Sequence, residues 1–182
     1  TREYQVPAVQ AFLDNKNGIL RGPPGCGKTV ILIATIAKIN APTLVVVHNQ
    51  MLLDQWCGAI AKFLGFAPNV ISGSKMQDNN TSVTVAMQQK LRNVLKTNEI
   101  KGFRNKFSVF IGDEVHRWAA NTFLDISRQI PARYKLGVSA DERRKDGKEF
   151  LIHNSFGPTV HEVNKSKLKA KGKILPIEIH MI

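Results

Sequence analysis

Short apolar runs alternate along this chain with amphipathic stretches of helical length, and this alternation limits the fold more than any other feature. The runs rich in β-branched residues are predicted to be strands: Gly18–Leu20, Thr43–Val47, Asn69–Ser72, Val83–Ala86, Phe107–Ile111 and Lys135–Ser139. The stretches that place apolar residues at helical spacing are predicted to be helices: Lys28–Ile39, Met51–Leu64, Gln88–Thr97 and Thr122–Ile130. Strands that are apolar throughout are typical of buried parallel strands, so the sequence predicts an α/β fold with a mainly parallel sheet and helices on both faces. Ligands of such sheets bind beyond the carboxyl ends of the strands.

The composition indicates one domain with a polyanionic partner. The 182 residues are 43% hydrophobic, and 26 Lys and Arg against 14 Asp and Glu give a formal charge of +12. Nucleic acid is the first candidate partner and an anionic membrane surface the second. We expect no membrane span, because no apolar run approaches the roughly 20 residues that a bilayer requires.

The two cysteines, Cys26 and Cys57, have no Cys or His neighbour at zinc-ligand spacing, so a metal–thiolate site is not expected. We interpret them as free thiols in a reducing compartment, the cytoplasm or the nucleus, and not as a mark of a secreted protein. The chain opens at Thr1 without an initiating Met or a signal-peptide pattern, and we expect it to be a segment of a longer protein.

A glycine-rich loop carries the clearest chemical pattern. The residues Gly22-Pro23-Pro24-Gly25-Cys26-Gly27-Lys28-Thr29 fit G-x-x-x-x-G-K-[ST] between a predicted strand and a predicted helix. The glycines let backbone N–H groups turn toward phosphate oxygens, and the helix start adds partial positive charge. We predict that the loop binds the phosphates of ATP, with Lys28 reaching the β- and γ-phosphates and Thr29 ligating Mg²⁺. A simple turn is the alternative, which we disfavour because every fixed position of the pattern is filled.

An acidic pair, Asp113 and Glu114, follows the predicted strand that ends near Ile111. A magnesium ion that bridges two phosphates requires a carboxylate nearby, and hydrolysis requires a second one to orient or deprotonate water. We assign the first role to Asp113 and the second to Glu114. An acidic pair that only caps the next helix is the alternative, and the phosphate loop makes it the weaker one.

The segment Asp113-Glu114-Val115-His116 is a D-E-x-H box, and with the phosphate loop it resembles the first RecA-like motor lobe of superfamily 2 helicases and translocases. The segment Arg2-Glu3-Tyr4-Gln5 resembles the adenine-binding L-R-x-Y-Q of the branch with repair helicases of the transcription-factor type and phage recombination helicases. This likeness implies that Arg2 and Gln5 bind the base. It also implies that His116 and Ser139 touch and couple the nucleotide state to the strand-binding face.

The resemblance extends over nearly the whole chain. Thr43–Val47 followed by Leu52-Leu53-Asp54-Gln55-Trp56 resembles motif Ia, and Gly137-Val138-Ser139-Ala140 resembles motif III. The implied nucleic-acid contacts are His48, Asn49, Ser72, Gly73 and Gln89. The chain departs from the family pattern where His48-Asn49 replaces Pro-Thr, where Met87 replaces the Thr of T-x-Q, and where Asp141 replaces the last Thr of motif III.

The motor lobe is expected over residues 1–160, and residues 161–182 are expected to form a basic linker and a strand that lead to a second lobe. Lysines alternate with other residues at positions 165–173, which we interpret as a solvated linker in preference to a phosphate-binding strip. Trp56 and Trp118 could stack on bases, but Trp56 lies on the apolar phase of its helix and is predicted to be core.

The resemblance implies an enzyme, an ATP-dependent helicase or translocase that uses Mg²⁺, with DNA favoured over RNA as its substrate. Such a motor cleaves ATP between two lobes, and the second lobe supplies arginines, so we expect this chain alone to be weakly active or inactive. The alternatives are the motor subunit of a restriction or packaging complex and a non-catalytic, ATP-gated nucleic-acid-binding module.

Overall fold

A computed structural model describes residues 2–73, 76–97, 102–117, 120–140 and 150–163. Within these ranges seven strands form one sheet in the order β3-β4-β2-β5-β6-β1-β7. Their bounds are β1 Asn17–Arg21, β2 Thr43–Val47, β3 Asn69–Ile71, β4 Val83–Met87, β5 Val109–Gly112, β6 Tyr134–Ser139 and β7 Thr159–Glu162. All neighbouring strands are parallel, which confirms the predicted α/β fold.

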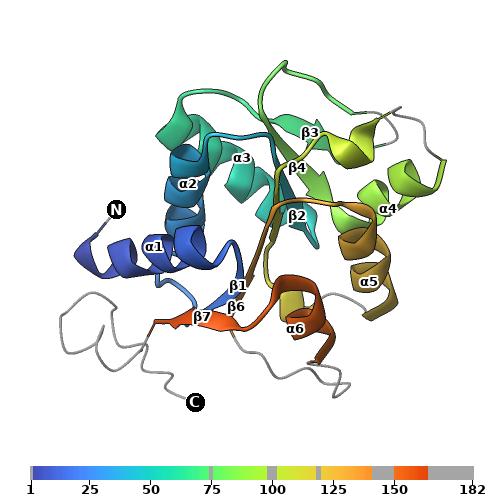
Figure 1. Ribbon diagram of the computed structural model, residues 1–182. Helices are drawn as coiled ribbons and strands as arrows, with labels where there is room; N and C mark the ends of the chain where they lie inside the picture. The colour runs from blue at the N-terminus through green and yellow to red at the C-terminus, as the bar shows by residue number, and fades with distance from the viewer. Residues whose placement is uncertain (1, 74–75, 98–101, 118–119, 141–149, 164–182) are drawn as a thin grey trace, which may run out of the picture.

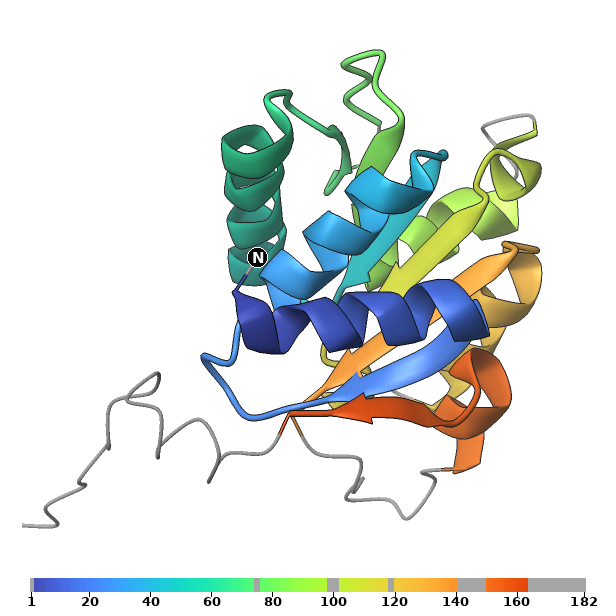
Figure 2. The same cartoon turned by 60° about the vertical axis from the view of Figure 1, so that its left-hand side comes forward.

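Helices cover both faces of this sheet (Figure 1). One face carries α1 Val6–Asn15, α2 Lys28–Ile39 and α3 Gln50–Leu64, which lie together in front of the sheet in Figure 2. The other face carries α4 Gln88–Thr97, α5 Ala120–Gln129 and α6 Phe150–Phe156. Short 3₁₀ turns complete the described elements: η1 Glu3–Gln5, η2 Phe103–Asn105 and η3 Val115–Arg117.

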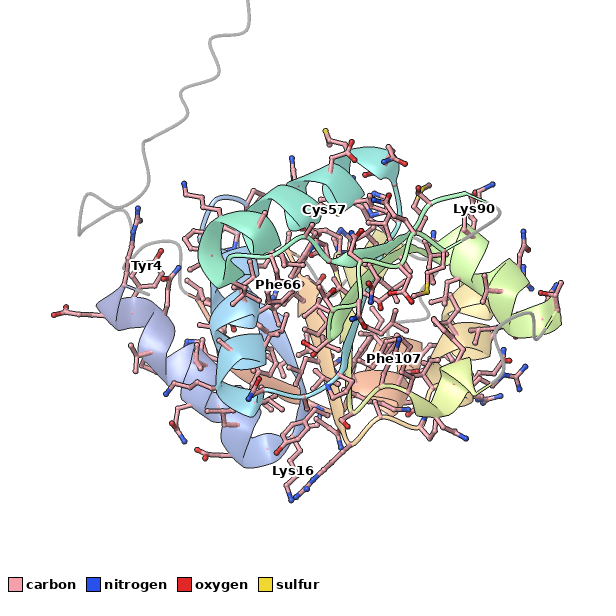
Figure 3. The ribbon with its side chains drawn as sticks, turned by 90° about the horizontal axis from the view of Figure 1, so that it is seen from above. Tyr4, Lys16, Cys57, Phe66, Lys90 and Phe107 are labelled. Carbon is pink, nitrogen blue, oxygen red and sulfur yellow. The ribbon has the colours of Figure 1, made fainter. Side chains whose placement is uncertain are left out.

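Two hydrophobic cores lie between the sheet and its helices, and the strands supply both by alternation. In β5 the side chains of Val109 and Ile111 join the core under α1, α2 and α3, whereas Phe110 joins the core under α4, α5 and α6. Phe66 packs against the first core and Phe107 belongs to the second, so the two label opposite layers in Figure 3. Burial on both faces explains why the strands are apolar throughout.

Some elements differ from the sequence-based expectations. β5 begins at Val109 and not at Phe107, because Phe107 packs edge-on against Phe103 with 4.9 Å between ring centroids before the strand starts. α1, α6 and β7 were not expected, and β7 crosses the boundary at residue 160. The division into lobe and linker therefore stays a prediction. Trp118, residues 141–147 and residues 164–182 lie outside the described residues.

Parallel strands bring all their carboxyl ends to one edge of the sheet, and the strand order divides that edge in two. β1, β5 and β6 carry the phosphate loop, the acidic pair and Ser139 at adjacent ends. β2, β3 and β4 carry the residues assigned to nucleic acid. None of the helices in the described part of the chain combines the length and apolar character that a membrane span requires.

Candidate nucleotide site

The phosphate loop joins the end of β1 to the start of α2. Gly25 and Gly27 have φ angles of 76° and 82°, in the left-handed region that glycine adopts without strain. A Cβ atom at Gly27 would also run into the side chain of Gln5. Gly27 caps α2, and the backbone N–H of Ile31 donates to its carbonyl at 3.1 Å. The loop therefore ends on a helix N-terminus, the arrangement that binds anions through backbone N–H groups.

Lys28 links this loop to the acidic pair. Its side chain is largely buried, and Nζ donates to the carbonyl oxygen of Gly22 at 3.0 Å. The same Nζ lies 3.5 Å from Oε1 of Glu114. The ammonium group therefore lies between the loop and a carboxylate, and its role toward phosphates stays a prediction. Thr29, the second residue of α2, is partly buried beside it.

Asp113 is a buried carboxylate at the end of β5, with 5% of its surface exposed. Its backbone N–H donates to the carbonyl of Val46 at 3.0 Å, and Oδ2 accepts a hydrogen bond from Nε1 of Trp56 at 2.8 Å. Burial raises the pKa of Asp113 above its ordinary value, the Trp56 hydrogen bond opposes that rise, and the charge of Glu114 adds to it. A desolvated carboxylate of this kind gains from a bound cation.

Glu114 has φ of 47°, a left-handed conformation that costs a non-glycine residue roughly 1 kcal/mol. Oε2 of Glu114 is buried and has no hydrogen-bond partner among the described residues. Nδ1 of His116 lies 3.4 Å from this oxygen and pairs with the hydroxyl of Ser139 at 2.8 Å. A strained backbone and an unsatisfied carboxylate oxygen are typical of a site that acts on a ligand.

The contact expected between His116 and Ser139 is present in the structure, where His116 lies within η3 and Ser139 ends β6. The carbonyl of Ser139 also accepts a hydrogen bond from the backbone N–H of Gly22 at 3.1 Å. Ser139 therefore touches both the phosphate loop and the D-E-x-H box. The coupling role of this pair stays a prediction.

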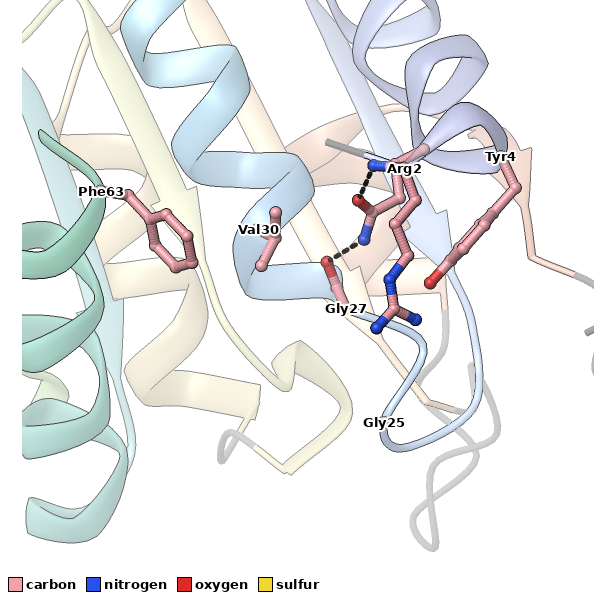
Figure 4. Close-up of a pocket in the computed structure, with 7 residues that line it drawn as sticks. Arg2, Tyr4, Gly25, Gly27, Val30 and Phe63 are labelled. Carbon is pink, nitrogen blue, oxygen red and sulfur yellow. Dashed lines mark hydrogen bonds between the residues drawn. The ribbon is translucent and has the colours of Figure 1, made fainter. Parts of the chain in front are cut away.

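η1 lies against the phosphate loop and forms one side of a pocket of about 400 Å³ (Figure 4). Tyr4 donates its hydroxyl hydrogen to the carbonyl of Cys26 at 3.1 Å, and Nε2 of Gln5 donates to the carbonyl of Gly27 at 3.5 Å. Oε1 of Gln5 accepts from the backbone N–H of Arg2 at 2.8 Å. The side chain of Gln5 keeps further hydrogen-bonding capacity. A carboxamide has two N–H groups and two lone pairs, and the two bonds of Gln5 use one of each.

The opposite side of this pocket contains two residues that the sequence analysis missed, Val30 and Phe63. Phe63 projects from the end of α3 with 51% of its surface exposed and faces Val30 in Figure 4. The ammonium group of Lys62 lies 5.5 Å from its ring centroid. The only signal for Phe63 in the sequence was an aromatic residue on an exposed position of an amphipathic helix, and this residue belongs to none of the motifs.

The residues assigned to nucleic acid follow β2, β3 and β4, as expected from their order in the chain. Asn49 is the N-cap of α3, where its Oδ1 accepts from the backbone N–H of Leu52 at 2.9 Å, and its Nδ2 lies 3.1 Å from Nε2 of His48. Burial lowers the pKa of His48, and the charge of Arg117 lowers it further. Ser72 is partly buried, whereas Gly73 and Gln89 are exposed. Their contacts with nucleic acid stay predictions.

Gln88, which opens α4 beside Gln89, was also missed. The Oε1 atom of Gln88 is buried and has no hydrogen-bond partner among the described residues. The same is true of Nδ1 of His48 and of Oε2 of Glu114. All of these atoms lie at the carboxyl edge of the sheet, after β4, β2 and β5 respectively. Three of the four buried side-chain atoms without a partner among the described residues thus lie at the edge where the phosphate loop ends, and the fourth, Nε of Arg104, belongs to η2 ahead of β5. Unsatisfied groups at that edge are what a ligand-binding edge would present.

The residues present fit a magnesium nucleotide. Mg²⁺ is commonly held by one or two carboxylates together with phosphate oxygens, so Asp113 and the hydroxyl of Thr29 suffice as protein ligands. The glycine loop, the buried ammonium of Lys28 and the helix start supply the complement for phosphates. Fold and site together define a P-loop nucleotide-binding lobe of the RecA-like type.

A family model described as "Type III restriction enzyme, res subunit" matches residues 1–143, and the chain belongs to this family. It is 32% identical over 170 residues to DNA 3'-5' translocase XPB2 of Sulfurisphaera tokodaii, a match that covers 93% of this chain and 37% of that protein. It is 31% identical over 155 residues to probable helicase D10 of Escherichia phage T5, covering 85% of this chain and 33% of that protein. The UvsW helicase from bacteriophage T4 shares the fold, with a TM-score of 0.72, 22% identity and coverage of 88% of this chain and 59% of that one.

These matches confirm the predicted resemblance to the first lobe of superfamily 2 helicases. The chain spans about a third of the length of the two relatives, 37% of the first and 33% of the second.

Proposed function

We propose that this chain is the ATP-binding motor lobe of a DNA helicase or translocase. The observation that carries the proposal is the position of Lys28, whose ammonium group lies between the phosphate-loop carbonyl of Gly22 and the carboxylate of Glu114. Loop and acidic pair thus face one space, although more than eighty residues separate them in the chain. The name of the Sulfurisphaera relative, a DNA 3'-5' translocase, favours DNA as the polymer.

In this proposal each residue of the site has one task. The loop N–H groups and Lys28 hold and neutralise the phosphates, while Asp113 and Thr29 would hold Mg²⁺, which supplies charge neutralisation between phosphate oxygens when bound. Glu114 would orient the attacking water and take its proton, using the Oε2 atom that has no partner among the described residues. Arg2 and Gln5 would hold the base at the pocket beside the loop.

Movement along DNA requires a second lobe that closes on the nucleotide, and we propose that such a lobe contributes arginines to the site. The greater length of the relatives supports this arrangement. His48, Asn49, Ser72, Gly73, Gln88 and Gln89 would then face the nucleic-acid backbone. We place the protein in the compartment where ATP and DNA meet, the cytoplasm or the nucleus.

A second candidate is the motor subunit of a restriction complex, which the description of the family favours. Both candidates require the same ATP site. They differ in outcome, because a restriction complex cuts DNA when ATP is hydrolysed and a helicase does not. ATP-dependent cleavage of a plasmid by the full-length protein would favour the restriction role.

The proposal is tested by the ATPase rate of the full-length protein with single-stranded DNA, duplex DNA, branched DNA and RNA in turn. We expect at least one DNA form to stimulate turnover, and binding to weaken steeply with salt because bound phosphates release counterions. A rate that no polynucleotide changes would overturn the motor assignment. Stimulation by RNA alone would overturn the choice of DNA.

A further inference from the structure

Trp56 is one of the largest fully buried side chains, with 1% of its surface exposed, which confirms that it is core and excludes base stacking. It packs in the core between the sheet and α1, α2 and α3, where its neighbours are aliphatic and aromatic. A leucine or phenylalanine would fill such a position without bringing a polar atom. A buried indole, in contrast, has an N–H group that must find an acceptor.

That acceptor is the carboxylate assigned to magnesium. Nε1 of Trp56 donates to Oδ2 of Asp113 at 2.8 Å, across a separation of 57 residues. Both partners are almost fully buried, at 1% and 5% exposure, so water does not compete for the bond. A hydrogen bond to a charged acceptor is among the stronger bonds in proteins.

The indole limits how the carboxylate can rotate. The ring of Trp56 is buried in the core, and the backbone of Asp113 is held by its bond to the carbonyl of Val46. The side chain is therefore fixed at both ends. Residues that hold metal ligands in one orientation commonly change metal affinity about 10- to 100-fold when they are replaced.

Trp56 also connects two halves of the ligand edge. It belongs to α3, whose N-cap is Asn49, one of the residues assigned to nucleic acid. Asp113 ends β5, on the nucleotide side. A displacement of α3 must stretch or break the bond to Asp113, because the indole is rigid and the helix carries it.

We propose that Trp56 is a positioning residue that orients Asp113 for Mg²⁺ and thereby makes magnesium–nucleotide binding depend on the position of α3. The inference rests on the proposed function, since it requires a nucleotide site at Asp113. It assigns to Trp56 a role beyond packing. Trp56 acts through Asp113 and touches no reacting atom.

The test is Trp56→Phe in the full-length protein, which keeps an aromatic ring and removes the N–H donor. A fluorescent ADP analogue is bound at equilibrium over a range of Mg²⁺ concentrations, so no turnover enters the measurement. The Mg²⁺ concentration for half-maximal binding should rise about tenfold. Binding of the analogue in EDTA should stay at the wild-type level, because the phosphate loop is untouched.

Phe12→Leu is the matched control. Phe12 is fully buried in the same core, and none of the hydrogen bonds given for the described residues joins it to Asp113. It should lower thermal stability without moving the Mg²⁺ midpoint. An unchanged midpoint in Trp56→Phe, or an equal shift in Phe12→Leu, would overturn the inference.

If Trp56→Phe does not fold, benzothienylalanine at position 56 keeps the indole shape and replaces the N–H with sulfur. The same tenfold shift is expected, and a wild-type midpoint would contradict the inference. If the wild-type protein itself binds the analogue equally well with and without Mg²⁺, that result contradicts the proposed function and not only the role of Trp56. Failure of the proposed function and failure of the Trp56 inference therefore give different results.

Discussion

At the scale of single residues, the site is built from groups that cost the fold stability. Glu114 is held in a left-handed conformation with a buried oxygen unsatisfied by the described residues, and Asp113 is a carboxylate almost without solvent. Native proteins tolerate such groups mainly where a bound ligand stabilises them. The phosphate loop and the acidic pair could be predicted from sequence, because their chemistry requires particular residue types at fixed positions.

Replacing Asp113 with Asn should stabilise the nucleotide-free protein. The folded pKa of Asp113 is raised above its ordinary value of 3.8, mainly by burial. Below the ordinary value the group is protonated in both states and has no effect. As the pH rises through that value the unfolded chain ionises first, so the folded state loses stability until the pH has passed the raised pKa of the folded state. Asn removes this cost and can still accept from Nε1 of Trp56.

We expect the free energy of unfolding at pH 7 to be higher in Asp113→Asn than in the wild type, as measured by denaturant titration in EDTA. The gain should shrink toward zero as the pH is lowered below the ordinary carboxyl range. Mg²⁺-dependent nucleotide binding should be lost at the same time. A variant less stable than wild type at pH 7 would show that the Asp113 charge is not a net cost.

At the scale of elements, the strand–helix alternation predicted the core of the fold well. The bounds of α2, α4 and β2 agree with the expectation, because buried helices and strands leave a strong periodic signal. α1 was missed since its pattern, interrupted by Pro7, follows directly on a motif assigned to the base, and Pro7 in fact stands in its first turn. β7 was missed because a short, partly exposed edge strand has little periodicity. Contacts between distant elements, such as that of Trp56 with Asp113, leave no mark in local sequence.

The pocket proposed for the base is lined by three elements, since η1 contributes Gln5 and its N-cap Arg2, α2 contributes Val30 and α3 contributes Phe63. An exposed ring beside a base pocket gains stability when a purine covers it. Phe63→Ala should therefore weaken ATP binding roughly three- to tenfold, corresponding to about 1 kcal/mol of aromatic contact. Equilibrium binding of a fluorescent ATP analogue measures this effect.

Phe150→Ala provides the control, because Phe150 is 58% exposed on the opposite helical layer and lines a different pocket. It should leave the dissociation constant of ATP unchanged. An unaltered affinity in Phe63→Ala would place the base away from α3.

At the scale of the whole molecule, the strand order separates the ligand edge into a nucleotide half, which includes the pair of His116 and Ser139, and a half assigned to nucleic acid. α3 contacts both halves, through its N-cap Asn49 and through the bond from Trp56 to Asp113. This arrangement is suited to a motor, in which a structural change at the nucleotide half must alter the half that binds nucleic acid. The charge of +12 is consistent with a surface that follows a phosphate backbone. Sequence reasoning reached the class of this molecule through motifs, whereas the division of the edge required the strand order.

The central claim, that Lys28 holds the nucleotide and Glu114 activates water, is tested most directly by comparing ATP binding and DNA-stimulated hydrolysis in two variants of the full-length protein. Lys28→Ala should lose ATP binding and hydrolysis together. Glu114→Gln keeps the shape of the side chain, so it should bind ATP while its turnover falls about 100-fold or more, the usual contribution of a general base. Wild-type turnover in Glu114→Gln would contradict the account.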